Sequence, residues 1–152
     1  MPLAMQQIGE SVYWNLEHEY IDLNTVNKGI INAGYEIGDK QIRTKLNKIK
    51  SNHYENILIK LGEHECIQFK RSKAIKFLND SEQKVFDDFL KRMKDLNIIN
   101  SIGEENSGEY EFSNRLYFVY FLIVGKMKKI LIQALNDGEI SKREFDKYYV
   151  GL

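Results

Sequence analysis

The chain has 152 residues, of which 43% are hydrophobic and 29% charged, a composition typical of a folded protein rather than a disordered or membrane-embedded one. This length accommodates one ordinary domain or two small ones. Basic and acidic residues balance at 22 each, so the chain as a whole has no net attraction for nucleic acid. This balance counts against a freestanding DNA-binding protein, which is usually basic.

Three features of the sequence indicate a cytoplasmic protein. The one cysteine, Cys66, excludes an internal disulfide and fits a reducing compartment. The first residues lack the basic segment of a secretory signal. The longest apolar run, 116–124, is about half the length that spans a bilayer. We therefore expect a soluble cytoplasmic protein without a membrane partner.

Helical spacing of apolar residues predicts three helices in residues 1–50, at 3–20, within 22–38 and at 39–50. Residues that begin or break helices mark the ends of the second helix. They are Asp22 or Asn24 at its start and Gly34 or Gly38 at its end. Residues 1–50 are therefore expected to form a three-helix unit.

Residues 51–121 contain an ordered run of patterns. The expected elements are, in order, a helix at 54–61 that stops at Gly62, an alternating segment at 66–69, a short basic helix at 71–78, a longer helix at 81–96 and a hairpin with strands at 98–99 and 110–112. Turn-forming residues at 101–108 fit the loop of the hairpin. This order is that of a winged-helix domain, a helix-turn-helix fold that usually binds DNA or docks onto proteins and rarely performs chemistry.

A long apolar helix is expected after the hairpin. Ser113 or Asn114 caps its start, and it runs to about Asn136. Its first three turns are apolar on almost every side, so this segment is either buried or part of an interface. Gly138 ends it, and a short final helix begins near Ser141.

Two segments resemble the C-terminal region of AAA+ and STAND-type ATPases, including archaeal origin-recognition-like proteins. Residues 2–9, Pro-Leu-Ala-Met-Gln-Gln-Ile-Gly, resemble the Gly-x-Pro helix start of the lid in these ATPases, with Met1 in the place before the proline. Residues 108–117, Gly-Glu-Tyr-Glu-Phe-Ser-Asn-Arg-Leu-Tyr, resemble the second wing strand and following helix of the attached winged-helix domain. Together with the spacing between them, the resemblance covers most of residues 1–121.

The patterns and the resemblance together predict a mainly α fold with three parts. These are a lid-like helical unit at 1–50, a winged helix at 51–121 and a C-terminal helical extension at 122–152. The chain departs from the family in lacking a Gly-rich phosphate loop with a lysine, an acidic strand motif and an arginine directly after Pro2 to sense nucleotide. It is either a fragment of a larger ATPase or a stand-alone relative.

No enzymatic activity is expected. The missing phosphate loop argues against ATP hydrolysis by these residues, and the sequence holds no Gly-x-Ser-x-Gly turn. The carboxylates lie among mixed charges, which gives no reason for perturbed pKa values. We therefore expect no catalytic residue and no cofactor.

Six basic residues are candidate contacts to double-stranded DNA, because basic side chains and helix starts of a DNA-binding fold hold the phosphate backbone. They are Lys70, Arg71, Lys73, Lys84, Lys91 and Arg92. Acidic residues of the longer helix and the hairpin would oppose phosphates: Asp87, Asp88, Glu104, Glu105, Glu109 and Glu111. A second basic cluster at 40–50 either attracts phosphates or is a solvated face. The sequence leaves both DNA binding and pure protein docking open.

A metal site is not expected. His53, His64 and Cys66 offer three ligands, but they lack the paired spacing of zinc sites, and Cys66 is instead expected to be buried on the short strand. Residues 136–145 imitate the second half of an EF-hand loop. That alignment places Leu135 at a ligand position, and leucine cannot coordinate calcium.

The long helix has more apolar residues than one core uses. Phe118, Leu122 and Ile130 are left for a partner surface once the other apolar positions face the core. The favoured function is that of a non-catalytic winged-helix module of an ATPase-related protein. This module either binds DNA or has a regulatory role. The alternative is a protein-interaction module that forms a homodimer, or docks on an ATPase domain in the same or another chain, through the helix at 116–135.

Overall fold

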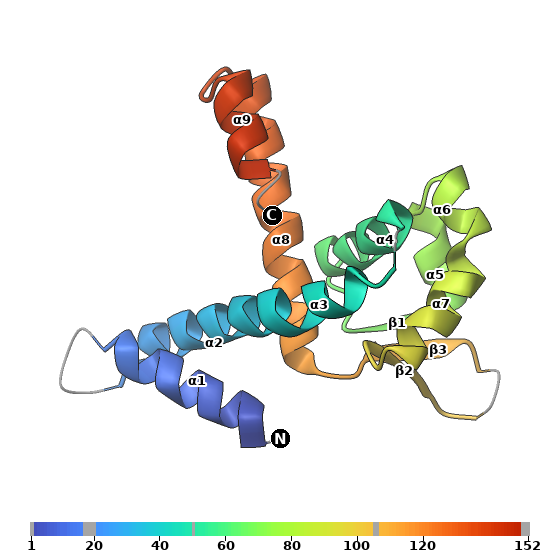
Figure 1. The fold of residues 1–152 in the computed structure, drawn as a ribbon, viewed down its shortest axis with the longest axis horizontal. Coiled ribbons are helices and arrows are strands. Elements are labelled where there is room, and N and C mark those ends of the chain that lie inside the picture. Colours follow the sequence, from blue (N-terminus) through green and yellow to red (C-terminus); the bar gives the residue numbers. More distant parts are fainter. Residues whose placement is uncertain (1, 17–20, 50, 105–106, 150–152) are drawn as a thin grey trace.

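The computed structural model describes residues 2–16, 21–49, 51–104 and 107–149. The described chain is mainly helical and contains a three-stranded antiparallel sheet (Figure 1). The elements in chain order are α1 (Pro2–Trp14), α2 (Leu23–Ile37), a π-helical segment η1 (Gly38–Ile42), α3 (Arg43–Leu46), α4 (Asn52–Glu63), β1 (Gln68–Lys70), α5 (Arg71–Ala74), a 3₁₀ turn η2 (Ile75–Phe77), α6 (Asp80–Lys84), α7 (Phe86–Asp95), β2 (Ile99–Ile102), β3 (Glu109–Phe112), α8 (Arg115–Asn136) and α9 (Lys142–Tyr149). The mainly α fold class is therefore confirmed.

The described part of residues 1–50 contains three α-helices, as expected, but the second and third are joined through η1 without a break in the helical backbone. Asp22 caps α2 as expected, because its side chain accepts a hydrogen bond from the Thr25 N–H at 2.7 Å. α2 ends at Ile37, directly before Gly38, but Gly38 keeps right-handed helical backbone angles and begins η1. α2 continues through η1 into α3 as one long helix, and α1 packs beside it (Figure 1). The described unit is thus a helical pair, and the expected end of the first helix at 17–20 lies outside the described residues.

Gly34 and Gly38, the two candidate ends of the second helix, let α8 approach the long helix closely. A Cβ atom on Gly34 would lie 2.6 Å from a methyl carbon of Val119, and one on Gly38 would overlap the ring of Tyr120. Glycine weakens an isolated helix by about 1 kcal/mol relative to alanine. Here the packing that a close helix crossing permits offsets this local cost. The sequence pattern contains only the local cost, so it indicated a helix end.

Between α4 and β3 the elements follow the order expected from the sequence. The longer helix differs in one respect, since a turn at Val85 divides it into α6 and α7. α6 begins with a capping box formed by Asn79 and Glu82. In the sheet, β3 is the central strand and pairs with both β1 and β2, in the order β1-β3-β2. The β2–β3 hairpin uses Gly103 and Gly108 at positive φ in its turn region.

One hydrophobic core connects the long helix, the sheet and α8. Among its buried members are Ile42 of η1, Leu61 of α4, Phe89 of α7, Ile99 of β2 and Phe121 of α8. α8 packs on the long helix and on α4, and these are among the most extensive helix contacts in the described chain. Its position therefore determines how the helical pair at the N-terminus lies relative to the sheet (Figure 1).

The C-terminal half of α8 extends beyond the core and α9 folds back beside it (Figure 1). Asn114 caps the start of α8, as expected, by accepting a hydrogen bond from the Leu116 N–H. Although α8 is long, no helix within the described ranges has the length and apolar character needed to cross a membrane.

The close contact between α4 and α8 predicts an asymmetric response to two glycine substitutions. A Cβ on Gly62 would lie 2.5 Å from the carbonyl oxygen of Phe121, which is backbone and cannot rotate away. We expect Gly62→Ala to lower the free energy of unfolding by about 1–3 kcal/mol, as overpacking does. Gly9→Ala in α1 is the control: nothing lies within 4 Å, so alanine should raise stability by up to about 1 kcal/mol. Urea unfolding measures both; an unchanged Gly62→Ala protein would contradict the close crossing.

Candidate nucleic-acid interface

The six basic residues expected to contact DNA come from elements at the end of the molecule that contains the small sheet. Their elements are β1 and the helices α5, α6 and α7, which lie together at one end of the molecule (Figure 1). Lys70 ends β1, Arg71 and Lys73 lie on α5, Lys84 ends α6, and Lys91 and Arg92 lie on α7. Arg71 is half-buried and the other five are exposed.

A buried carboxylate determines where α6 and α7 lie. Glu82 is 2% exposed and accepts hydrogen bonds from the Asn79 N–H at 2.9 Å and from the Lys60 ammonium at 2.5 Å. The first bond closes the capping box of α6, and the second ties α6 to α4. Burying this carboxylate is favourable only because both partners are present. The start of the helix pair that carries the candidate residues is therefore fixed to the core.

Arg71 and Asp87 form a two-pronged ion pair between α5 and α7. The Arg71 Nε donates to one carboxylate oxygen at 2.6 Å and the Nη2 to the other at 2.8 Å. The guanidinium holds the pKa of Asp87 below its ordinary value, and the carboxylate raises the pKa of Arg71. One of the six candidate cations is thus already neutralised within the chain.

Lys70 also has an ion-pair partner within the chain, in its case a residue of the neighbouring strand. It lies opposite Glu109 in the β1–β3 register, and the two side chains form an ion pair at 2.7 Å that raises the pKa of Lys70. Next to it, Gln68 donates a hydrogen bond to Glu111 at 3.0 Å. Two of the acidic hairpin residues therefore pair with β1, and Glu104 is exposed. Glu105 lies outside the described residues.

Four candidate residues remain after these pairs are formed. Lys73, Lys84, Lys91 and Arg92 are exposed and have no ion-pair partner in the described part of the chain. We refer to these four as the α5–α7 cations. α7 also carries exposed acidic residues at its two ends, Asp87, Asp88 and Asp95, so the surface is mixed in charge rather than strongly basic. Such a surface suits a few phosphate contacts and not a continuous phosphate track.

The second basic cluster, at 40–50, is a paired and solvated face in the described residues. Lys40 pairs with Glu36 at 3.5 Å and Arg43 with Asp39 at 3.1 Å, both one helical turn apart. Lys45 lies over the ring of Tyr117 at 5.1 Å. These contacts favour the structural interpretation of this cluster over phosphate binding.

The sequence predicted that Cys66 is buried on the short strand, and this prediction is wrong. It lies two residues before β1 and is half-buried, and this burial raises the pKa of its thiol. The neighbouring His64 stacks on the ring of Phe77 with a centroid separation of 4.1 Å. Across the described residues no group of three histidine, cysteine or acidic side chains is placed to hold a metal ion.

The three expected interface residues of α8 differ in exposure. The ring of Phe118 lies 5.8 Å from that of Phe112 and packs against the core, and Leu122 is half-buried. Ile130, on the projecting half of α8, is 66% exposed. Only Ile130 of the three is therefore freely available to a partner.

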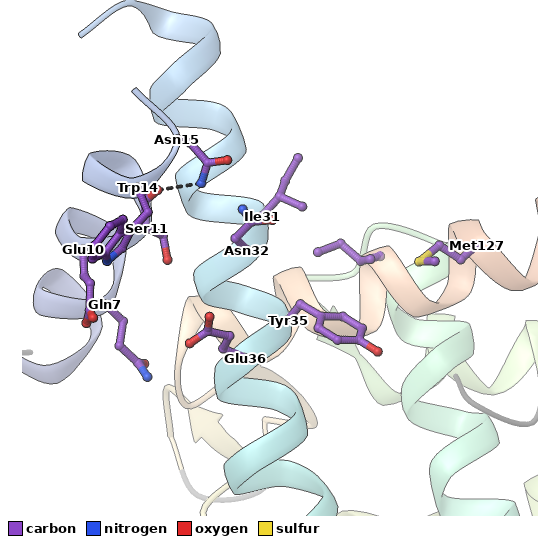
Figure 2. Close-up of a pocket in the computed structure, with 11 residues that line it drawn as sticks. Gln7, Glu10, Ser11, Trp14, Asn15, Ile31, Asn32, Tyr35, Glu36 and Met127 are labelled. Atoms are coloured by element: carbon purple, nitrogen blue, oxygen red, sulfur yellow. Dashed lines mark hydrogen bonds between the residues drawn. The ribbon is translucent and has the colours of Figure 1, made fainter. Parts of the chain in front are cut away.

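A groove between α1, α2 and α8 was not found by sequence reasoning. It has a volume of about 610 Å³, and α2 forms its floor between walls from α1 and α8 (Figure 2). Trp14, Ile31 and Met127 are among its lining residues. The available signal was the surplus of apolar residues on these helices, but locating the groove requires knowing that α8 crosses the long helix.

Comparison of the chain with protein-family models, with curated proteins and with solved structures yields no match. Its function is therefore inferred from its fold and side chains.

The Arg71–Asp87 pair predicts a specific pH dependence of stability. Because the pKa of Asp87 is below its ordinary 3.8 in the folded protein, the pair stabilises the fold above that pH and is lost as pH falls through the lowered value. Arg71 is half-buried but Asp87 is exposed, so solvent screens the pair, and we expect Asp87→Asn to lower the free energy of unfolding by about 1 kcal/mol or less at neutral pH and not at all in strong acid.

The neighbouring Asp88→Asn is the matched control for this measurement. It removes the same charge from the first turn of α7 without breaking the pair with Arg71. Urea unfolding of both variants at several pH values gives the difference due to the pair. If both variants lose the same free energy of unfolding at neutral pH, the carboxylate of Asp87 stabilises the fold only through the helix N-terminus and not through Arg71.

Proposed function

We propose that this chain is a non-catalytic winged-helix module of the kind attached to AAA+ and STAND-type ATPases, and that it binds the backbone of duplex DNA. The order helix, strand, helix, helix pair and hairpin from α4 to β3 supports the winged-helix assignment. The resemblance at residues 2–9 and 108–117 supports the connection to ATPases. The observation that carries DNA binding is the presence of the four α5–α7 cations, without ion-pair partners in the described chain, on the helices beside the hairpin.

In a helix-turn-helix fold the second helix of the pair enters the major groove. In the proposed complex α6 and α7 take this place, with Lys84, Lys91 and Arg92 at phosphates and Lys73 at the neighbouring backbone. Arg71 and Lys70 contribute less, because each has a carboxylate partner within the chain. The acidic hairpin would be repelled by phosphates, so it does not follow the backbone. The complex is therefore weak and sensitive to salt.

Protein docking is the second candidate function. It is favoured by the exposed apolar side chains on the projecting half of α8, which include Met127, Ile130 and Ile132. On this proposal the acidic β2–β3 hairpin and α8 face a protein, such as an ATPase domain, and the α5–α7 cations only solubilise the surface. The two candidates use different faces of the molecule, so they can be tested separately.

The DNA proposal gives a quantitative salt dependence. With four phosphate contacts, the logarithm of the association constant for DNA should fall linearly with the logarithm of the salt concentration, with a slope of no more than about 3.6 in magnitude. Replacing Lys91 and Arg92 together with alanine should reduce the slope by about 1.8. Lys147→Ala on α9 removes one charge far from the helix pair and should leave the slope unchanged (Figure 1). Absence of binding to mixed-sequence duplexes at low salt would rule out the proposal.

Releasing Arg71 should strengthen binding. Asp87→Asn removes the partner of Arg71 and frees its guanidinium for a fifth phosphate, which should steepen the slope by about 1 relative to Asp88→Asn. The two variants have the same net charge, so any difference between them reports Arg71 alone. Identical slopes would place Arg71 away from the nucleic acid.

A further inference from the structure

A small cavity lies between the sheet and the helical turns that follow β1. We refer to it as the β1–α5 cavity. It has a volume of about 290 Å³, and its lining comes from the segment before β1, from β1, α5 and η2, and from the adjoining ends of β2 and β3. Most of this lining is apolar: Cys66, Phe69, Ala74, Phe77 and Ile102. Mostly apolar walls with a few polar groups are typical of small-molecule sites, and this volume is at the lower end of their range.

Contacts within the chain hold the walls of the β1–α5 cavity in place. The ring of Phe77 stacks on that of His64, with the ring centroids 4.1 Å apart and the ring planes 13° apart. Lys70 and Glu109 join β1 to β3 through their ion pair at 2.7 Å. Ala74 is 1% exposed and belongs to the hydrophobic core. The space is therefore preformed, and a ligand can enter it without opening the core.

Lys73 carries the uncompensated charge among the described lining residues. Lys70 and Glu109 neutralise each other through their ion pair. Burial raises the pKa of the Cys66 thiol, which therefore stays neutral at pH 7 and adds no negative charge. Lys73 is exposed and has no ion-pair partner in the described part of the chain. The β1–α5 cavity thus presents an apolar surface beside a single available cation.

We propose that the β1–α5 cavity binds a small organic monoanion, whose apolar body lies against Phe77 and Ile102 and whose carboxylate pairs with the Lys73 ammonium. A cation would be repelled by Lys73, and a nucleotide carries more negative charge than one lysine balances. The apolar body provides most of the affinity, because the ion pair at Lys73 is solvated and therefore screened. The carboxylate provides the preference for an anion over a neutral molecule of the same shape.

Amide NMR titration of the full chain, without DNA, tests the site. The probe is phenylacetate, a small aromatic monoanion, and phenylacetamide is its neutral counterpart. Phenylacetate should cause saturable shifts that concentrate at Cys66, Lys73, Phe77 and Ile102 and their neighbours. Phenylacetamide should shift the same residues but bind about 2- to 5-fold more weakly, because it lacks the exposed ion pair. Absence of saturable shifts at these residues, or equal affinity for the two compounds, would overturn the proposal.

Two lysine variants locate the carboxylate. Lys73→Met removes the charge but keeps an unbranched side chain, so it should weaken phenylacetate by the same 2- to 5-fold and leave the affinity for phenylacetamide unchanged. Lys76→Met is the matched control, because Lys76 on η2 is also exposed but is not among the lining residues. It removes the same net charge and should leave both affinities unchanged. Equal weakening of phenylacetate in the two variants would contradict binding at Lys73.

A bound monoanion should also weaken DNA binding, and this consequence rests on the proposed function. Lys73 is one of the α5–α7 cations, and a carboxylate paired with it competes with a phosphate. Saturating phenylacetate, compared with chloride at the same ionic strength, should reduce the magnitude of the salt slope by about 0.9. Phenylacetate should not change the slope of Lys73→Met.

The two titrations fail in distinguishable ways. If phenylacetate binds the β1–α5 cavity but the salt slope is unchanged, Lys73 does not contact DNA, and the link to DNA is overturned while the site stands. Absence of any DNA binding contradicts the proposed function alone, because the NMR titration contains no DNA. Absence of the NMR shifts overturns the site and leaves DNA binding as proposed.

Discussion

The close crossing of α8 over two other helices is the constraint on which the rest of this structure depends. On one side α8 packs against the long helix at Gly34 and Gly38, and on the other it meets α4 at Gly62. At Gly62 the contact reaches the backbone of α8, which leaves no space for a Cβ atom. Because dispersion attraction falls steeply with distance, helices this close gain contacts that bulkier residues would prevent. The crossing therefore orients the N-terminal helical pair, the sheet and the projecting half of α8 at once.

Internal ion pairs determine how much charge this electroneutral chain offers to a partner. Lys60 is tied to the buried Glu82, Lys70 to Glu109 and Arg71 to Asp87. The first pair is structural, because it anchors α6 to α4. The other two lie at the surface and neutralise basic residues that the sequence alone made candidates for phosphate binding. What remains for DNA is a small set of cations, and a DNA complex that relies on them is modest and sensitive to salt.

Features encoded locally could be predicted from the sequence, and those created by tertiary contacts could not. The caps at Asp22 and Asn114 and the hairpin ending at Phe112 follow from short-range patterns, and the structure confirms them. Gly38 follows the last residue of α2, as one of the two predicted ends, but the helical backbone continues through it, because helix propensity does not include the contact with α8 that these glycines permit. The Arg71–Asp87 pair joins residues 16 positions apart on different helices, and a single sequence carries no signal for such a contact. The groove likewise exists only once α8 is laid across α2.

The two candidate functions use different surfaces of the molecule. The helix pair α6–α7 with α5 is the proposed surface for DNA, and the exposed apolar side chains on the projecting half of α8 are the candidate surface for a protein. These elements lie at separate places on the fold, so each surface can be altered without disturbing the other (Figure 1).

DNA binding by the α5–α7 cations is tested most directly by a residue-by-residue map of amide NMR shifts during titration with a mixed-sequence duplex. We expect the shifts to concentrate at Lys73, Lys84, Lys91 and Arg92 and their neighbours on α5, α6 and α7, with little change in α9. Shifts confined to the β2–β3 hairpin and α8, or no shifts at low salt, would contradict it.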